Sequence, residues 1–306
     1  MALPSIIVVL VATGLMYPLG ARLLSSKLYG AAAAAFFAST PLVWLAARAG
    51  SEALYQLPIV IGWLVCIDRF RSEPRPLHLA AAGGLLALGL YTHPAAIVTM
   101  PVLLALSVVT LTALGGLPVS DRRLGAMLAA FVALAIPFAV YLALHPEHLH
   151  DRIMAHGLYD ADRYNMLQGL REMFSWVGLT ARTEVYYDSF NPALLFLSGG
   201  GIVKSITNPQ VFLPPFAVVL ALGFHRILTH DSPPAAWLAV GGFFAAPIAA
   251  ALTAQPPVPA RLLLMAPCAA IIAAYGLRHL MTGRRATRPR EVMQIDGHQS
   301  AITGAV

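Results

Sequence analysis

Long apolar runs with no Asp, Glu, Lys or Arg in their interior are the feature that most constrains this chain. Nine runs can be separated, at about residues 3–20, 28–47, 53–67, 77–92, 95–117, 124–144, 210–224, 235–253 and 262–280. About 20 apolar residues in a helix cross the hydrocarbon core of a bilayer, although the third and seventh runs are short for this. The runs are too long and too uniformly apolar for alternating barrel strands, and helices satisfy every backbone amide in lipid. The sequence therefore predicts an all-α polytopic membrane protein with about nine transmembrane helices.

The composition of the 306 residues agrees with this class. Charged residues make up 11% of the chain and apolar residues 58%, and the mean hydropathy is +0.72. Because a soluble domain carries roughly 25% charged residues, a soluble enzyme is excluded. The formal net charge of +6 accompanies no nucleic-acid motif, so we expect it to set membrane topology. Cys66 and Cys268 each lie in an apolar run, which indicates packing rather than a disulfide or a metal site.

Basic residues are unevenly distributed between the connections on the two sides of the predicted bundle. One set of connections holds thirteen: Arg22, Lys27, Arg69, Arg71, Arg75, Arg122, Arg123, Arg226, Arg278, Arg284, Arg285, Arg288 and Arg290. The other set holds seven, most of them in one long connection: Arg48, Arg152, Arg163, Arg171, Arg182, Lys204 and Arg261. Since basic residues in short connections stay in the cytoplasm, the first set is predicted to be cytoplasmic and the second extracytoplasmic.

Two polar segments interrupt or follow the apolar runs. The connection at 145–209 is predicted to lie outside, and Leu167, Leu170, Phe174 and Val177 recur within it at the spacing of a helix lying in the interface. Residues 281–306 are basic, polar and aperiodic, which is typical of a disordered cytoplasmic tail. The chain thus divides into a transmembrane unit at 1–280 and a tail at 281–306.

Ionisable residues gather at the predicted outer ends of the helices. No run holds Asp, Glu, Lys or Arg in its interior, whereas ion-coupled transporters usually place such residues near the midplane. The outer ends carry Arg48 and Glu52 in AARAGSE, His93 in YTHP and Arg261 in PPVPAR. This pattern favours a site at the outer membrane surface over a transport path.

Four segments occur in the order found in a known class of membrane enzymes. They are MYPLGARLLSSKLYGAAAAAFFASTPLVWLAARAGSEALYQLPIVIGWL, GLLALGLYTHPAAIVTMP, YYDSFNPALLFLSGG and PPVPARLLLMAPCAAIIAAYGL. The first resembles the second to fourth helices of the GT-C membrane glycosyltransferases. Within that class it is most similar to the dolichyl-phosphate-mannose protein mannosyltransferase and aminoarabinose-transferase type, and the likeness covers about residues 10–280.

The resemblance implies a fold and an activity. It implies a GT-C-like bundle in a bacterial inner or plasma membrane. The bundle would transfer a sugar, with inversion, from a polyprenyl-phosphate donor to a glycan, lipid or protein acceptor at the outer face. Such chemistry needs a carboxylate to accept the proton of the acceptor hydroxyl and cations to neutralise the departing lipid phosphate.

The resemblance also implies roles for charged residues. Glu52 matches the acidic residue of the second outer loop, which implies a catalytic or metal-binding role; the competing interpretation pairs it with Arg48 one helical turn away. Arg261 matches an arginine that faces the donor phosphate, and its planar fork suits phosphate oxygens, although snorkelling at a helix end also explains it. Arg48 and Lys204 are further candidates for contact with the phosphate or headgroups.

Further residues are candidates for a substrate pocket. His93 precedes Pro94 where relatives carry Lys or His, so it is expected to contact a ligand or metal unless it is a solvated interfacial histidine. Tyr187, Asp188 and Asn191, with Tyr186, match the outer-loop signature; a belt of interfacial aromatic residues is the alternative. No cofactor is assigned, and a divalent metal with Glu52 and His93 as ligands is left open.

Two other motifs match known sites only superficially. The first is HPEHLHD, which contains His145, Glu147, His148, His150 and Asp151; its spacing fits no standard zinc site. The second is GGGIVKS at Gly199 to Ser205, which lacks the Gly-Lys pair of a phosphate-binding loop. Both are interpreted as polar connections.

One departure from the family leaves rival functions open. The family often carries its principal acidic residue on a first outer loop, after a first helix that has no counterpart in this chain. We therefore expect either a fragment or a partner chain that supplies this part. The rivals are a non-catalytic relative that binds lipid-linked sugar or partners a complete transferase, and a transporter or flippase.

Overall fold

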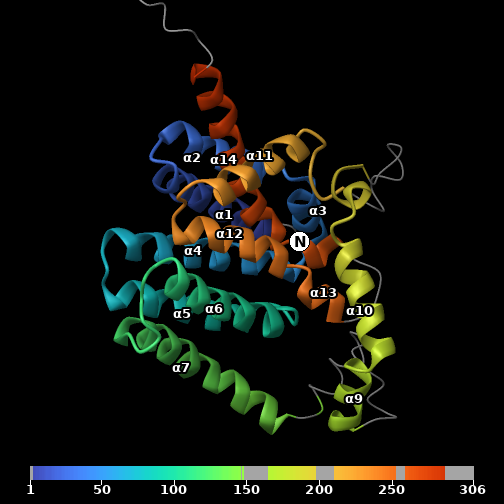
Figure 1. Ribbon diagram of the computed structural model, residues 1–306. Coiled ribbons are helices and arrows are strands. Elements are labelled where there is room, and N and C mark those ends of the chain that lie inside the picture. The colour runs from blue at the N-terminus through green and yellow to red at the C-terminus, as the bar shows by residue number, and fades with distance from the viewer. Residues whose placement is uncertain (1–2, 146, 148–164, 198–209, 253–258, 287–306) are drawn as a thin grey trace, which may run out of the picture.

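Helices account for all regular structure that the computed structural model describes (Figure 1). The described residues are 3–145, 147, 165–197, 210–252 and 259–286. The prediction of an all-α protein is confirmed over this part of the chain. Its first part contains α1 (Leu3–Leu23), α2 (Lys27–Ala38), α3 (Pro41–Ala49), η1 (Glu52–Tyr55), α4 (Gln56–Ser72), α5 (Pro76–Gly89), α6 (Ala96–Ala113) and α7 (Arg122–Leu144). Its second part contains α9 (Met166–Met173), α10 (Trp176–Asp188), the π-helical turn η2 (Ala193–Leu197), α11 (Phe216–Thr229), α12 (Pro234–Ala245), α13 (Ile248–Leu252), η4 (Pro259–Leu262) and α14 (Met265–Ala286).

Several described helices are long and apolar enough to cross a membrane. Five stretches meet this condition: α1, η1 with α4, α6, α7, and α12 with α13. A sixth is the predicted run 28–47, but this run is two helices, α2 and α3, bent by 52°. The bend falls where Pro41 begins α3, because proline cannot donate the backbone hydrogen bond that would continue α2. Helices α5 and α11 are apolar but shorter, so the count of nine spanning helices stays a prediction.

Helix α14 is the centre of the bundle. It packs against α11, α2 and α12 (Figure 1), and every residue from 262 to 276 is buried. Glycines allow α11 to approach it closely: a Cβ built on Gly223 would lie 1.9 Å from the Ile272 carbonyl oxygen, and one on Gly276 would lie 1.8 Å from that of Val219. α14 continues to Ala286, into the segment 281–306 that was predicted to be a tail.

Helix α7 lies at the edge of the bundle (Figure 1) and packs against α5. Tyr91, after α5, donates a hydrogen bond of 2.8 Å to the Leu134 carbonyl and its ring meets Phe138 edge-on. Only 6% of the most apolar 18-residue stretch of α7 is buried inside the protein. Most of this apolar helix therefore faces the surroundings.

The helices run between two ends of the bundle, which we name after a residue at each. The His93 end carries η1, the α5–α6 connection and η4. At the Arg22 end, Nε of Arg22 donates a hydrogen bond of 2.7 Å to Asp68, and Nη2 bonds Ser72 at 3.2 Å, which ties α1 to the last turns of α4. In Figure 1 the α4–α5 and α6–α7 connections lie at the left of the bundle, and α9 and α10 lie at the right.

The predicted interfacial helix is two helices rather than one. The Ser175 side chain accepts a hydrogen bond from the Gly178 amide at 3.1 Å and so starts α10 anew after α9. Leu167, Phe174 and Trp176 remain largely exposed. Arg182 holds α10 to the bundle, because Nε donates to the Leu252 carbonyl of α13 at 3.0 Å.

Candidate functional site

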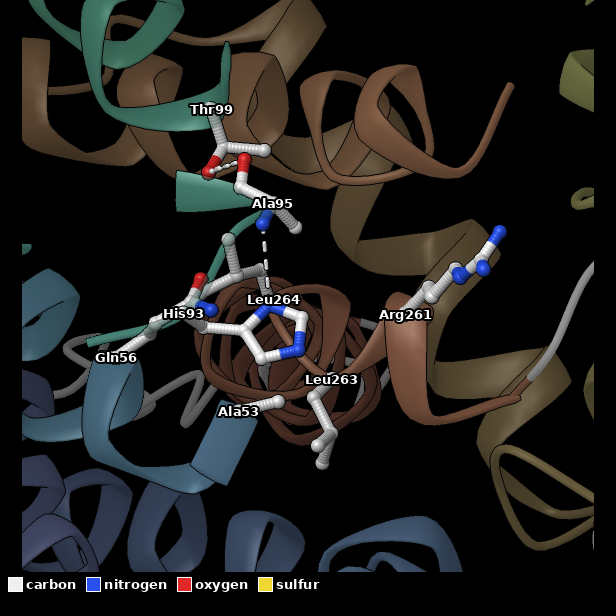
Figure 2. A pocket seen from close by; sticks show the side chains of 8 residues that line it. All are labelled: Ala53, Gln56, His93, Ala95, Thr99, Arg261, Leu263 and Leu264. Carbon is white, nitrogen blue, oxygen red and sulfur yellow. Dashed lines mark hydrogen bonds between the residues drawn. The ribbon is translucent and has the colours of Figure 1, made fainter. Parts of the chain in front are cut away.

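Three connections that are far apart in the sequence meet at the His93 end and form two adjoining pockets. The pocket that we call the Glu52 pocket has a volume of about 160 Å³ and is lined by Glu52, Leu90, Tyr91, Thr92, His93, Pro94 and Phe138. The Gln56 pocket has a volume of about 10 Å³ and is lined by Ala53, Gln56, His93, Ala95, Thr99, Arg261, Leu263 and Leu264 (Figure 2). His93 lines both pockets and therefore separates a carboxylate on one side from a guanidinium-bearing residue on the other.

Glu52 reaches its pocket because the chain turns sharply before it. Gly50 ends α3 with φ of 66°, a left-handed conformation that favours glycine, and η1 then begins at Glu52. The turn breaks the helical register between Arg48 and Glu52, and no ion pair joins them in the described structure. The alternative interpretation of Glu52 as the partner of Arg48 is therefore wrong. Arg48 is exposed and lines neither pocket.

His93 is held in one tautomer by its own turn. Its Nδ1 accepts a hydrogen bond of 3.2 Å from the Ala95 amide (Figure 2), so the neutral ring carries its proton on Nε2. In this form Nε2 is a donor suited to an oxygen of a ligand, whereas metal binding needs a lone pair there. Within the described ranges no three His, Cys, Asp or Glu side chains are grouped to hold a metal ion.

Arg261 lies on η4, the turn that leads into α14, and is half-buried. Burial lowers the pKa of its guanidinium, since removal from water disfavours the charged form. Its stem lines the Gln56 pocket, but the guanidinium is directed away from His93 and Gln56 (Figure 2). Arg261 can therefore meet an anion at the rim of the pocket rather than inside it.

Gln56 was not singled out by the sequence. It is the first residue of α4, its side chain is only 2% exposed, and Oε1 is buried without a hydrogen-bond partner among the described residues. An amide four residues after Glu52, at the start of an apolar run, is the signal that could have found it. Asp68 was also missed, because α4 extends beyond the predicted run 53–67 and buries this carboxylate against Arg22.

The residues predicted from the long connection are not brought to these pockets. Tyr187, Asp188 and Asn191 are exposed at the end of α10 and line neither pocket. Asn191 instead accepts a hydrogen bond from the Ala193 amide at 2.9 Å. Tyr186 donates to the Phe244 carbonyl at 3.1 Å, which helps to hold α10 against α12, and partial burial raises its pKa.

Other sequence candidates lie partly or wholly outside the described residues. Lys204 and the glycine-rich segment at 199–205 are outside them, as are His148, His150 and Asp151. His145 stacks on Tyr141 with ring centroids 4.7 Å apart. Glu147 is exposed.

The interior of the described bundle satisfies its polar groups locally. The hydroxyls of Thr40, Thr99 and Ser107 each donate to a carbonyl one turn earlier in their own chain. Trp63 donates to Ser107 at 3.0 Å. Among these buried side chains Gln56 is the exception.

Comparisons with protein families, with curated proteins and with solved structures found no match to this chain.

Proposed function

We propose that this chain is an integral membrane protein whose His93 end lies at the extracytoplasmic surface. Helix α7 supports the membrane location, because it leaves large apolar side chains such as Leu128, Val132 and Ile136 exposed along 23 residues. The sidedness follows from the larger number of basic residues in the short connections at the opposite, Arg22 end. Contiguous apolar surface of this extent is unfavourable in water and is suited to lipid. The exposed apolar side chains of α9 and the start of α10 suit the headgroup region.

We further propose that the protein binds a polyprenyl-phosphate-linked sugar at the His93 end and transfers the sugar to an acceptor. The single observation that carries this proposal is the junction at His93, where the pocket of Glu52 adjoins the pocket rimmed by Arg261. A carboxylate beside a guanidinium at the edge of an apolar bundle suits a ligand with a neutral polar head, an anionic phosphate and a lipid chain. The Glu52 pocket is smaller than the roughly 300 Å³ or more of typical whole-ligand sites, as expected if only the head enters it.

In the proposed reaction each polar group has one task. The acceptor hydroxyl loses its proton to Glu52, its oxygen bonds to the anomeric carbon of the sugar, and the bond from that carbon to the lipid phosphate breaks with inversion. Arg261 offsets the charge of the departing phosphate, and this anion would in turn favour the charged form of a partly desolvated guanidinium. His93 donates from Nε2 to an oxygen of the bound head.

The test is transfer of labelled sugar in membranes that contain the protein. Membranes are incubated with polyprenyl-phosphate sugar labelled in the sugar, and label is followed from this donor into glycan, protein or other lipid products. We expect Glu52→Gln to lower the rate by about a hundredfold or more, as for loss of a general base. Glu73→Gln is the matched control, because Glu73 is exposed at the Arg22 end and only pairs with Arg75 at 3.3 Å. Equal rates for Glu52→Gln and the unmodified protein would refute the catalytic role.

A second candidate function is a subunit that binds the lipid-linked sugar without transferring it. The observation in its favour is that Glu52 is the one carboxylate among the residues that line the two pockets. This candidate predicts that Glu52→Gln leaves the activity of an assembled system unchanged. A transporter is disfavoured, since the charged side chain buried in the described bundle, Asp68, is paired with Arg22 at one end.

A further inference from the structure

The unmatched amide of Gln56 is the polar group that the proposed reaction does not use. Buried polar atoms in proteins are almost always hydrogen-bonded, so a buried acceptor without a donor calls for an explanation. The Gln56 side chain is 2% exposed and lines the small pocket beside His93, with Oε1 lacking a partner in the described structure. An acceptor kept in this state is suited to a ligand that brings its own donor.

No donor of the surrounding side chains reaches Oε1 of Gln56 in the described structure. The Thr99 hydroxyl gives its one proton to the Ala95 carbonyl at 3.1 Å. Nδ1 of His93 is itself an acceptor, from the Ala95 amide. The guanidinium of Arg261 is directed away from Gln56 (Figure 2).

The two spaces that adjoin the Gln56 pocket differ in polarity. On the bundle side it adjoins an apolar cavity through the shared residues Thr99 and Leu264, and that cavity is lined further by Val60, Leu103, Gly242, Ala245, Ala246 and Cys268. None of these additional side chains carries an oxygen or nitrogen donor. On the other side the wall is His93, which also lines the Glu52 pocket. The polar space next to Gln56 is therefore the Glu52 pocket, and a ligand held there is the one best suited to offer a donor.

The size of the space and the polarity of Oε1 define the ligand group. A volume of about 10 Å³ holds roughly one water-sized group, so a single substituent enters and a ring does not. A phosphodiester at neutral pH presents only acceptors to an acceptor, which leaves Oε1 unsatisfied. A sugar hydroxyl supplies both the required proton and the required size.

We propose that Gln56 determines specificity for the sugar, by accepting a hydrogen bond from one hydroxyl of the sugar ring held in the Glu52 pocket. This inference rests on the proposed function and assigns the sugar and the phosphate of the ligand to different residues. Gln56 binds a hydroxyl of the sugar, whereas Arg261 contacts the phosphate at the rim of the pocket.

The test compares ligands that differ only in the sugar. The purified full chain in lipid nanodiscs is titrated with a short-chain polyprenyl phosphate, with the same lipid phosphate carrying mannose, and with free methyl mannoside. We expect the unmodified protein to bind the mannosyl lipid more tightly than the bare lipid phosphate. Gln56→Leu should lose about tenfold in affinity for the mannosyl lipid, the value of one hydrogen bond, and keep its affinity for the bare lipid phosphate.

A stability measurement separates recognition from a structural role. Because Gln56→Leu removes an unmatched acceptor, the ligand-free variant should melt at or above the temperature of the unmodified protein. Thr112→Val is the matched control: it removes a hydroxyl that donates to the Val108 carbonyl at 2.9 Å near the far end of α6, and it should lower the melting temperature without changing binding.

The binding and melting measurements distinguish a failure of the role of Gln56 from a failure of the proposed function. An equal loss of affinity for both lipids, or a lower melting temperature of ligand-free Gln56→Leu, overturns the role assigned to Gln56 while the proposed function stands. Gln56-dependent binding of methyl mannoside as tight as that of the mannosyl lipid supports the sugar recognition and moves it to the acceptor. Absence of binding of every probe by the unmodified protein overturns the proposed function, and this inference with it.

Discussion

The contact between α11 and α14 should fail when one methyl group is added to it. A Cβ on Gly276 would lie 1.8 Å from the Val219 carbonyl oxygen, whereas ordinary contact begins at about 3.4 Å. The atom in the way is backbone, so it cannot rotate aside as a flexible side chain would. Gly276→Ala must therefore push α11 away from the central helix along its length. Both helices lose dispersion contacts, and such overpacking costs about 3 kcal/mol, the upper part of its usual range.

The expected result is a large fall in thermal stability with a control of opposite sign. At roughly 2–4 °C per kcal/mol, Gly276→Ala should lower the melting temperature of the detergent-solubilised protein by at least about 6 °C. Gly125 lies inside α7 and a Cβ there meets nothing within 4 Å, so Gly125→Ala should be neutral or stabilise by about 0.5–1 kcal/mol through helix propensity. Equal melting temperatures for the two variants would refute the close packing of α11 on α14.

Three further predictions concern the two ends of the bundle. Arg22→Leu leaves the carboxylate of Asp68, whose side chain is 6% exposed, without its partner, and should lower the free energy of unfolding by about 2 kcal/mol. The double variant with Asp68→Leu should recover stability in thermal unfolding, and additive losses would contradict the ion pair. Hydrogen bonds from Arg123 lower the pKa of Asp121 from 3.8 to about 2, so the carboxylate adds stability above about pH 4 that is lost as the pH falls towards 2. Melting of Asp121→Asn should then match the unmodified protein near pH 2 and fall below it at pH 5, and a constant difference would argue against the linkage. Cysteines placed at Ser51 and at Glu73 should react with an impermeant maleimide from opposite sides of the membrane, and labelling of both from one side would refute the proposed topology.

The helical class and the apolar segments follow from local pattern, whereas the ends of the helices do not. Each predicted run contains described helical structure because an apolar backbone in lipid must bond to itself, which every run satisfies independently of the others. The run 28–47 divides at Pro41, and the interfacial helix divides at Ser175, because a capping residue or proline can stop a helix within an apolar pattern. Single residues of this kind shift boundaries without changing the overall class.

The candidate site shows the same division between local and distant information. Glu52, His93 and Arg261 could each be picked out as polar residues at predicted helix ends, whereas the turn at Gly50 that separates Glu52 from Arg48 is seen only in the structure. Gln56 offers only a small local signal, an amide four residues after Glu52, because its significance is that no donor faces it, and this depends on side chains from α6 and from the segment that leads into α14.

Low charge and long apolar runs are sufficient to predict a helical protein with several helices that could span a membrane, because these properties are sums over neighbouring residues. The meeting of Gln56, His93 and Arg261 is a different kind of fact, since these residues are joined by packing between helices distant in the chain. The close approach of α11 to α14 is a fact of the same kind, because it depends on Gly223 and Gly276 each facing the backbone of the other helix, which is a property of the folded bundle rather than of any one segment.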